Sequence, residues 1–542
     1  MRTGRARAFG WVSAVVASAL AGAALALGAQ RVAIGTTPHA RPPLRAQSSG
    51  AGAGDAAQRA RAEHPNGRSE EHESRDRRAS AEQADPLLDA RPAAMPTVVE
   101  WIAAGGGPTP EYNQLSVEDD LGLFAETLGA DRGLLFFAGG PGTRSVQVLD
   151  ETRRGDEVES QIGDFFDARD GRDAHYRTTR LALQGPATVS ATLAAIDAAF
   201  ATGTKPLTIF LAGHGAGGET PSDTTLLMWG DETLTPAALA ETLDHAPPSR
   251  TVRVIITSCF SGGFGELAYR GARAELGAAT TDRCGFFAAP FDLEASGCDP
   301  DPDRAVHEGY AIHFLAALRG QDRDGRDARA DLDLDHDGHI SLLEAHVRAV
   351  IASASLDVPT TTSETWLRGA APAHGAESPY PLPEADAVIA AMAERTDLVG
   401  REPRARTELA QRHRVMTELT QQLTQIDEVE ATAYRAASAA LLSRWPMLDD
   451  PWHPDFQSTL TREHDAISAF LDGAPELRAW REARTHVESL EQRLDDEQVD
   501  AAPYERLVRA LDDRVLAARL HAQGGAAWQH YERVLACERG VL

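Results

Sequence analysis

Apolar positions in the middle of the chain follow two patterns, short runs that predict strands and helical spacing that predicts helices. Thr97 to Ala103 and Gly133 to Ala138 are short apolar runs next to glycines, as expected of buried strands. Ser116 to Leu128 and Val189 to Phe200 carry apolar residues at helical spacing, and Ser116 is a candidate N-cap. Strands that alternate with helices predict an α/β fold with a mostly parallel sheet flanked by helices.

Two further predicted strands end in residues that can carry chemistry. Leu207 to Leu211 leads into Gly-His-Gly with His214, and Val252 to Ile256 leads into Thr-Ser-Cys with Cys259. In open α/β sheets, ligands and catalytic groups lie at the carboxyl ends of the strands. A nucleophilic thiol needs a base such as histidine within reach. We therefore predict that His214 and Cys259 form one site; the alternative is a buried cysteine and an unrelated loop histidine.

The last third of the chain has a different pattern. Residues 384 to 540 are rich in Glu, Arg, Ala, Leu and Gln, with apolar residues at i, i+3 and i+4. This spacing predicts a helical bundle or coiled-coil region over residues 379–542. The segment is divided into several helices by prolines 446, 451 and 454 and by Gly473-Ala474-Pro475.

Two further segments lie in the middle of the chain. Before the His214 strand, residues 150–180 are charged and irregular, which favours a surface loop. A helix is expected over Ala305 to Leu318.

The N-terminal segment is typical of export. Arg2, Arg5 and Arg7 precede an uncharged apolar run over residues 11–29, which predicts a signal peptide or a membrane anchor over residues 1–30. Residues 31–94 contain few large apolar residues, so they predict a disordered linker. We expect a periplasmic or secreted protein, held at a membrane only if the N-terminal segment is retained.

Charge and cysteine content narrow the classes of partner and compartment. The formal net charge of −28 argues against a nucleic-acid partner. The chain has four cysteines and no Cys-x-x-Cys motif, which argues against a cysteine-based zinc site. In an exported protein, Cys284 and Cys298 could form a disulfide; the alternative is two unpaired thiols.

A second candidate site lies between Asp333 and Glu344. Its spacing matches the twelve-residue calcium loop of an EF-hand, with Gly338 at the sharp turn. The alternative is an acidic helix start in which Ser341 is the N-cap and Glu344 the third helical residue. Calcium is the only cofactor that the sequence suggests, and no organic cofactor is expected. The candidate ligands are Asp333, Asp335, Asp337, the carbonyl of His339, Ser341 and Glu344.

The segments around His214 and Cys259 resemble those of a known family. AGHGAGG and TSCFSGGF are similar to the motifs of caspase-like cysteine peptidases, which include legumains, metacaspases and caspases, and most of all to bacterial legumain-like members. The resemblance covers about residues 95–350 and implies a peptidase domain over residues 95–378. By this resemblance Cys259 attacks a peptide carbonyl, His214 acts as acid and base, and the N–H groups of Gly215 and Cys259 hold the oxyanion.

The resemblance also suggests a third residue and has two departures. Tyr112-Asn113 occupies the place of a Tyr-Asn pair whose asparagine orients the histidine in legumains; the alternative is a turn-forming asparagine. Leu115 and Phe260 stand where legumains carry an arginine and a glutamate, so legumain-like specificity is not implied. The sequence thus predicts a cysteine endopeptidase that acts on peptides or proteins. The alternative is a catalytically weak caspase-like scaffold for protein binding. The helical tail is expected to mediate self-association or to cover the site.

Overall fold

The computed structural model of the protein describes residues 96–149, 156–166, 174–376, 378–450 and 453–542. The predicted signal peptide or anchor and the predicted linker lie outside these ranges. Among the described helices, none combines the length and the apolar character needed to cross a membrane.

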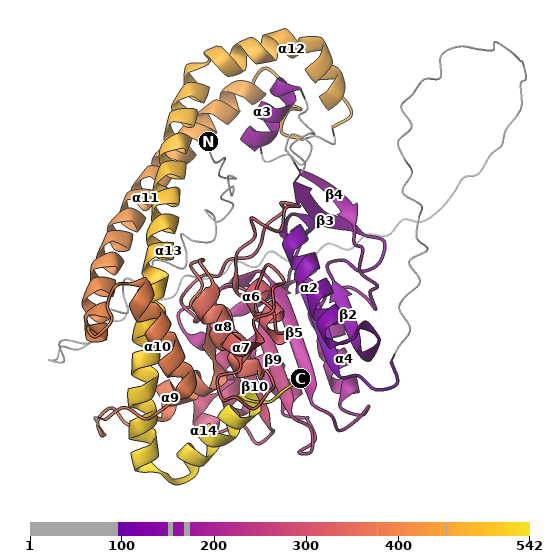
Figure 1. Ribbon diagram of the computed structural model, residues 1–542. Coiled ribbons are helices and arrows are strands. Elements are labelled where there is room, and N and C mark those ends of the chain that lie inside the picture. Colours follow the sequence, from indigo (N-terminus) through magenta and orange to yellow (C-terminus); the bar gives the residue numbers. More distant parts are fainter. Residues whose placement is uncertain (1–95, 150–155, 167–173, 377, 451–452) are drawn as a thin grey trace, which may run out of the picture. The chain divides into compact units, whose positions relative to one another are not determined.

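A six-stranded sheet forms the centre of the α/β region (Figure 1). Its strand order is β11-β10-β9-β5-β1-β2, and every neighbouring pair is parallel except β10 with β11. This mostly parallel sheet confirms the predicted fold class. The strands are β1 (Trp101–Gly106), β2 (Gly133–Phe137), β5 (Leu207–Gly213), β9 (Val252–Ile256), β10 (Arg283–Phe287) and β11 (Thr360–Thr361).

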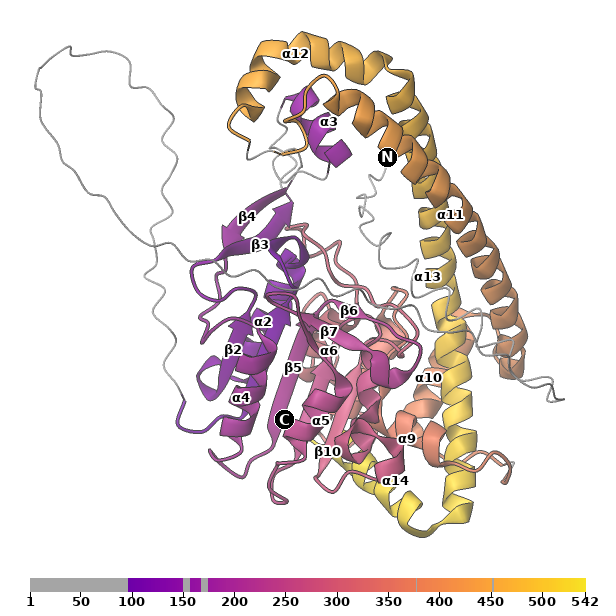
Figure 2. The same cartoon turned by 180° about the vertical axis from the view of Figure 1, so that it is seen from behind.

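Helices cover both faces of the sheet, because successive side chains of each strand point to opposite sides. Along β5, for example, Phe210 packs in one core and Ile209 in the other. One face is covered by α2 (Leu115–Leu128), α6 (Tyr310–Leu318) and α8 (Leu342–Ala352), and the other by α4 (Val189–Ala199) and α5 (Pro236–Leu243) (Figure 2). Fully buried strands with two apolar faces explain the near-continuous apolar runs in the sequence.

Smaller elements connect these layers. The short helix α7 (Arg329–Leu332) precedes α8, and the short strands are β6 (Gly215–Ala216), β7 (Thr225–Met228) and β8 (Glu232–Leu234). The 3₁₀ helices are Pro110–Tyr112, Ala130–Arg132, Pro221–Asp223, Ser261–Ala268, Arg270–Ala272, Ala274–Leu276 and Glu402–Arg404.

Three elements differ from the expectation. Residues 150–180 are not all loop: β3 (Arg144–Leu149) pairs with β4 (Ala174–Thr178), and α3 (Glu157–Phe166) lies between them in sequence. α3 forms because Val158, Ile162 and Phe165 share a core with the C-terminal helices, a tertiary contact that local composition does not reveal. In addition, β1 begins at Trp101 rather than Thr97, and α6 begins at Tyr310 rather than Ala305.

The C-terminal region is helical, as predicted. α11 and α13 run antiparallel and side by side (Figure 1), since Arg406 pairs with Asp512 while Arg412, further along α11, pairs with the earlier Glu497. The prolines near residue 450 and Pro475 separate α11, α12 and α13, as expected. The helices of this region are α9 (Thr362–Ala370), α10 (Pro383–Arg395), α11 (Ala405–Leu442), α12 (Phe456–Gly473), α13 (Pro475–Gln523) and α14 (Gly525–Glu538).

These helices share cores with the α/β region. Val347 of α8 packs in one cluster with Leu507 of α13, and all described residues belong to one compact unit. Arg506 of α13 is 2% exposed. Its guanidinium donates to the backbone carbonyls of Val350, Ser353, Ser355 and Asp357. Because this buried guanidinium donates to four carbonyls of one segment, it fixes α13 to the end of α8 and the chain that follows it.

The disulfide differs from the prediction. Cys284 on β10 is bonded to Cys537 on α14, not to Cys298, and the two residues are 253 positions apart in sequence. Cys298 is unpaired and exposed. Cys537 and Val534 of α14 pack directly on Cys284, so the fold brings Cys537 to β10 while Cys298 lies in the crevice described below. The pairing of Cys284 with Cys298 was therefore wrong.

Candidate functional site

The strand order places a crevice at one edge of the sheet. From β1 the chain goes first to β2 on one side and then to β5 on the other side. Helices that leave such a switch point cover opposite faces, and a crevice remains at the carboxyl ends of the two strands. The segments that follow β1 and β5 carry Tyr112, Asn113 and His214. The resemblance and the topology therefore point to the same edge.

The register of β5 and β9 brings His214 and Cys259 to the same level. Leu211 is paired with Ile256 in these neighbouring parallel strands. His214 lies three residues after Leu211, and Cys259 lies three residues after Ile256. The structure therefore brings together the two residues that the strand-end pattern selected.

The backbones around these residues approach each other closely, and glycine permits it. A Cβ added to Gly215 would lie 2.2 Å from the carbonyl oxygen of Cys259. A Cβ added to Gly213 would lie 2.0 Å from the carbonyl oxygen of Gly106, and its φ of 138° disfavours any other residue. The Gly-His-Gly sequence is thus what lets the His214 turn pack between the ends of β1 and β9.

The His214 ring is held by residues that follow β1. Its Nε2 lies 2.9 Å from Oε1 of Gln114, and the ring packs edge-on against Tyr112 at a centroid distance of 5.2 Å. Burial lowers the pKa of the imidazole to about 4, opposed by a hydrogen bond with the backbone of Tyr112. At neutral pH the imidazole is therefore uncharged and can accept a proton.

The Cys259 thiol is held by a loop that lies across it. Sγ lies 3.3 Å from the N–H of Ala295 and 3.4 Å from its carbonyl oxygen. Burial raises the pKa of the thiol to about 12, and the charge of Glu294 raises it further. The hydrogen bonds found among the described residues do not join Sγ to the His214 ring. The pair is thus neutral, with each member bound to other partners.

Asn113 has a different position from the one the resemblance implies. Its side chain is fully buried, with Oδ1 accepting from the N–H of Gly107 at 2.8 Å and Nδ2 donating to the carbonyl of Thr109 at 2.6 Å. It therefore shapes the turn after β1, which is the alternative role considered for it. Gln114, which the sequence did not single out, is the residue that contacts the histidine.

Leu115 and Phe260 also have roles in the local structure. Leu115 is buried in the core as the first residue of α2. Phe260 directly follows the thiol and adopts a left-handed conformation, with φ of 59° and ψ of 10°. Such a backbone is uncommon for a bulky residue and is often found at functional sites. The N–H of Phe260 donates to the carbonyl of Leu293, so the same loop holds this residue as well.

A small hollow lies at the same edge of the sheet as the thiol. Gly213 and Thr257 line it from the ends of β5 and β9, and Cys298 and Arg304 line it from the segment after β10. Asp120 of α2 also lines it. Burial raises the pKa of Asp120 to about 7, although the charge of Arg304 opposes this. The hollow thus holds an acidic and a basic side chain at the same sheet edge as Cys259.

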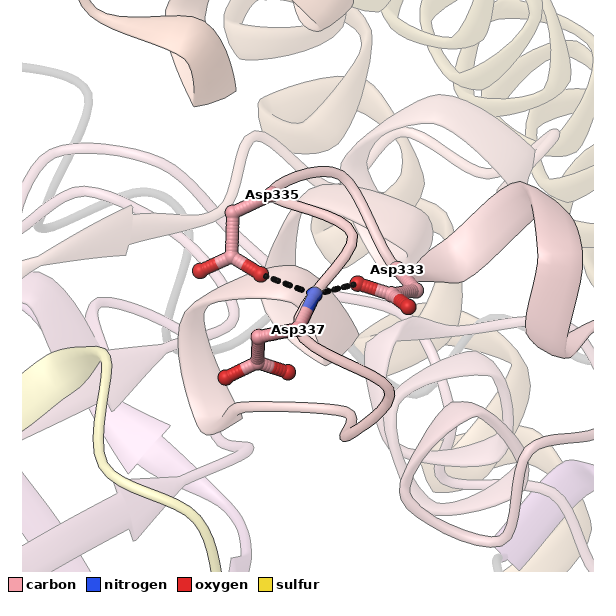
Figure 3. A group of neighbouring side chains, drawn as sticks. All are labelled: Asp333, Asp335 and Asp337. Atoms are coloured by element: carbon pink, nitrogen blue, oxygen red, sulfur yellow. Dashed lines mark hydrogen bonds between the residues drawn. The ribbon is translucent and has the colours of Figure 1, made fainter.

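The acidic loop brings some of the predicted metal ligands together. One carboxylate oxygen each from Asp333, Asp335 and Asp337 lie within 4.8 Å of one another. The N–H of Asp337 donates to Asp333 and Asp335 (Figure 3), and left-handed turns at His336 and Gly338 curl the backbone around the carboxylates.

Ser341 and Glu344 form the helix cap that the alternative interpretation describes. The Ser341 hydroxyl accepts from the N–H of Glu344, and the Glu344 carboxylate accepts from the N–H of Ser341. The other Glu344 oxygen accepts from the N–H of Leu334 at 2.7 Å. Glu344 therefore ties the start of the loop to its end. His339 is exposed in this loop, and its N–H donates to Asp337.

Comparisons with known proteins add no family. No protein-family model matches the sequence, and a search of curated proteins finds no match.

Proposed function

We propose that the protein is a cysteine endopeptidase of the caspase-like type, closest to legumain-like peptidases. The observation that carries the proposal is the register of β5 and β9, in which Leu211 is paired with Ile256. His214 and Cys259 each follow one of these paired residues by three positions. His214 follows β5 at the topological switch point, and Cys259 follows the neighbouring strand β9; this position supports the proposal, because ligands bind at the switch point in open α/β sheets.

The proposed reaction uses a neutral thiol and a neutral imidazole. His214 takes the proton of Cys259 as Sγ attacks the peptide carbonyl, and then gives it to the leaving amine. The N–H groups of Gly215 and Cys259 hold the oxyanion. A water molecule, activated by His214, then hydrolyses the thioester. Before the first step, Sγ must leave Ala295 and the imidazole must turn from Gln114, so substrate binding has to rearrange these contacts.

Labelling with a thiol-reactive peptide probe tests the nucleophile. We expect the parent protein to be labelled at Cys259, His214→Ala to be labelled there at least about tenfold more slowly, and Cys259→Ala to retain no more than a label on Cys298 while its thermal melt is retained. Mass spectrometry of the labelled peptide identifies the site. Label on Cys298 alone, or equal labelling of the Cys259→Ala variant, would reject the assignment. An unlabelled, folded parent that also cleaves no peptide library would favour the scaffold alternative.

We further propose that the Asp333–Glu344 loop binds Ca²⁺. The three clustered aspartates supply hard oxygen ligands, which Ca²⁺ prefers. The present hydrogen bonds of Glu344 keep its carboxylate next to the loop start, from which it could join the ligand set. Bound calcium would hold the loop that begins α8, a helix that packs under the sheet.

Calorimetric titration tests the calcium site. We expect Asp335→Asn and Glu344→Gln to weaken Ca²⁺ binding by at least about tenfold, because each removes a charged ligand. Gln can still form the helix cap at position 344, so folding should be retained. Asp331→Asn, an exposed substitution two residues before the loop, is the matched control. Equal affinity of Glu344→Gln and the parent would contradict the ligand set.

A further inference from the structure

The two unpaired cysteines of the chain lie at the same edge of the sheet. Cys284 and Cys537 are bonded to each other, which leaves Cys259 and Cys298 as free thiols. Thr257, two residues before Cys259, lines the hollow at the sheet edge together with Cys298. The sequence offers Cys298 either as a partner of Cys284 or as an unpaired thiol, so its proximity to Cys259 comes from the fold.

The loop after β10 brings the second thiol to the first. Ala295 contacts Sγ of Cys259 through both its N–H and its carbonyl. Cys298 follows only three residues later, so its Cα lies at most about 11 Å from that of Ala295. Burial in the crevice is the main cause that raises the pKa of the Cys298 thiol, and the ionised Cys259 is the largest of the charges that raise it further, which is consistent with a short separation.

The conformation of the same loop allows Cys298 to approach Cys259. Residues 288–309 form neither helix nor strand. Cys298 follows Gly297, which has a positive φ of 119°, and a Cβ added to this glycine would meet no atom within 4 Å. On either side the loop is held, since the N–H of Ser296 donates to Asp357 and the N–H of Asp299 donates to Ser116. Cys298 thus sits on a short, turning segment between two fixed points beside Cys259.

The two thiols differ in access. Cys298 is exposed, whereas Cys259 is half-buried under Ala295. A reagent from solution therefore meets Cys298 first. The chain also contains a disulfide, and disulfides form and persist in oxidising compartments. In such a compartment an exposed thiol next to a second thiol is open to thiol–disulfide exchange.

We propose that Cys298 is a resolving thiol, and that a small-molecule disulfide converts Cys298 and Cys259 into a reversible intramolecular disulfide. The Cys298 thiolate attacks one sulfur of the small disulfide, its sulfur–sulfur bond breaks, and one small thiolate leaves. The Cys259 thiolate then attacks the Cys298 sulfur and displaces the second small thiolate. Both leaving thiolates take up the protons that the cysteines lost. The two cysteine sulfurs are oxidised and the small disulfide is reduced to two thiols.

The bond would block Sγ of Cys259 and be removed by a dithiol. It would also protect the thiol from irreversible oxidation to sulfinic and sulfonic acids. This inference concerns the thiols themselves, so it does not depend on whether the site hydrolyses peptides.

Intact-mass measurement of the full chain treated with cystamine tests the proposal. We expect the parent to lose two hydrogens and gain no cysteamine, and peptide mapping to find Cys259 bonded to Cys298. Cys259→Ser should instead keep one cysteamine on Cys298. Cys298→Ser should acquire cysteamine on Cys259 at least about tenfold more slowly than the parent loses its two free thiols, because the exposed entry point is missing.

Several results would overturn the proposal. These are a parent that keeps one or two cysteamine groups, a parent whose thiols do not react in the folded state, and a new bond that involves Cys284 or Cys537. Equal rates of Cys259 modification in Cys298→Ser and in the parent would also overturn the proposal. Peptidase activity is not the readout, so failure here leaves the proposed function untouched, and loss of the proposed function leaves this result untouched.

Discussion

At the scale of residues, the site is defined by close backbone approach and by neutral groups. Gly213 and Gly215 let the His214 turn pack against Gly106 and Cys259. Burial lowers the pKa of His214 to about 4 and raises that of Cys259 to about 12. Neither group is charged between these values, so the pair differs from a preformed thiolate–imidazolium pair, in which an opposite charge would hold the thiolate.

The pH dependence of alkylation follows from these pKa values. Only the thiolate reacts with iodoacetamide. At pH values below the pKa, the thiolate fraction increases tenfold for each unit by which the pH is raised. We expect the rate of Cys259 alkylation in Cys298→Ser to rise by about tenfold per unit from pH 6.5 to 9.5. The modified peptide is quantified by mass spectrometry at each pH. A rate that is constant over this range would contradict the neutral pair and indicate a thiolate held by charged His214.

At the scale of elements, α14 docks through a buried acid. Glu538 is fully buried, and its Oε1 accepts from the N–H of Ser363 at 2.8 Å, in the first turn of α9. Burial raises the pKa of Glu538 to about 8, against the hydrogen bond to Ser363, which lowers it. A carboxyl group in this position is mostly protonated at neutral pH, so α14 is joined to α9 through an uncharged contact.

Stability should therefore change with pH through Glu538. The folded chain holds this proton up to about pH 8, whereas an unfolded chain releases it near the usual value of 4.5. The stabilisation of the folded chain that depends on this proton is fully present below pH 4.5 and is lost as the pH rises to about 8. We expect Glu538→Gln to be more stable than the parent at pH 8.5 by about 1–3 kcal/mol, and to gain less at pH 5.5.

Denaturant unfolding at the two pH values measures this difference. Glu532→Gln, on the same helix but exposed, is the matched control and should follow the parent. If the difference between Glu538→Gln and the parent is the same at both pH values, Glu538 does not titrate as its burial implies.

At the scale of the whole molecule, the C-terminus is fixed to the sheet at several points. The disulfide joins α14 to β10, and the carbonyl of Val541 accepts from the buried guanidinium of Arg253 on β9. The N–H of Leu342, at the start of α8, donates to the carbonyl of Gly540. The last residues thus contact the start of β9 and the end of the acidic loop, which fixes the C-terminal helices to the sheet and to the loop.

Removal of the disulfide should be costly. The bond closes a loop over a sequence separation of 253, and cross-links of long loops remove much entropy from the unfolded chain. We expect Cys537→Ser to lower the free energy of unfolding by about 2–5 kcal/mol, measured with guanidinium chloride. Cys298→Ser, which removes an exposed unpaired thiol, should change it by less than about 0.5 kcal/mol. Equal losses in the two variants would contradict a structural role of the bond.

The sequence by itself determined the fold class, the helical C-terminal region and the strands that end in His214 and Cys259. These features follow from local periodicity, because a buried strand and an amphipathic helix leave their repeat in any short segment. The strand ends also selected two residues that the register then placed at the same level of neighbouring strands. The aspartates of the acidic loop could be found in the same way, since they lie close together along the chain.

Only the tertiary structure decided which partners these residues have. Cys537 pairs with Cys284 from 253 positions away, Gln114 rather than Asn113 contacts His214, and Ala295 lies on the Cys259 thiol. The helix α3 likewise depends on a core shared with α12 and its neighbours. A local pattern reports whether a side chain is buried but not what it is buried against. That second choice is made by packing between segments far apart in the chain.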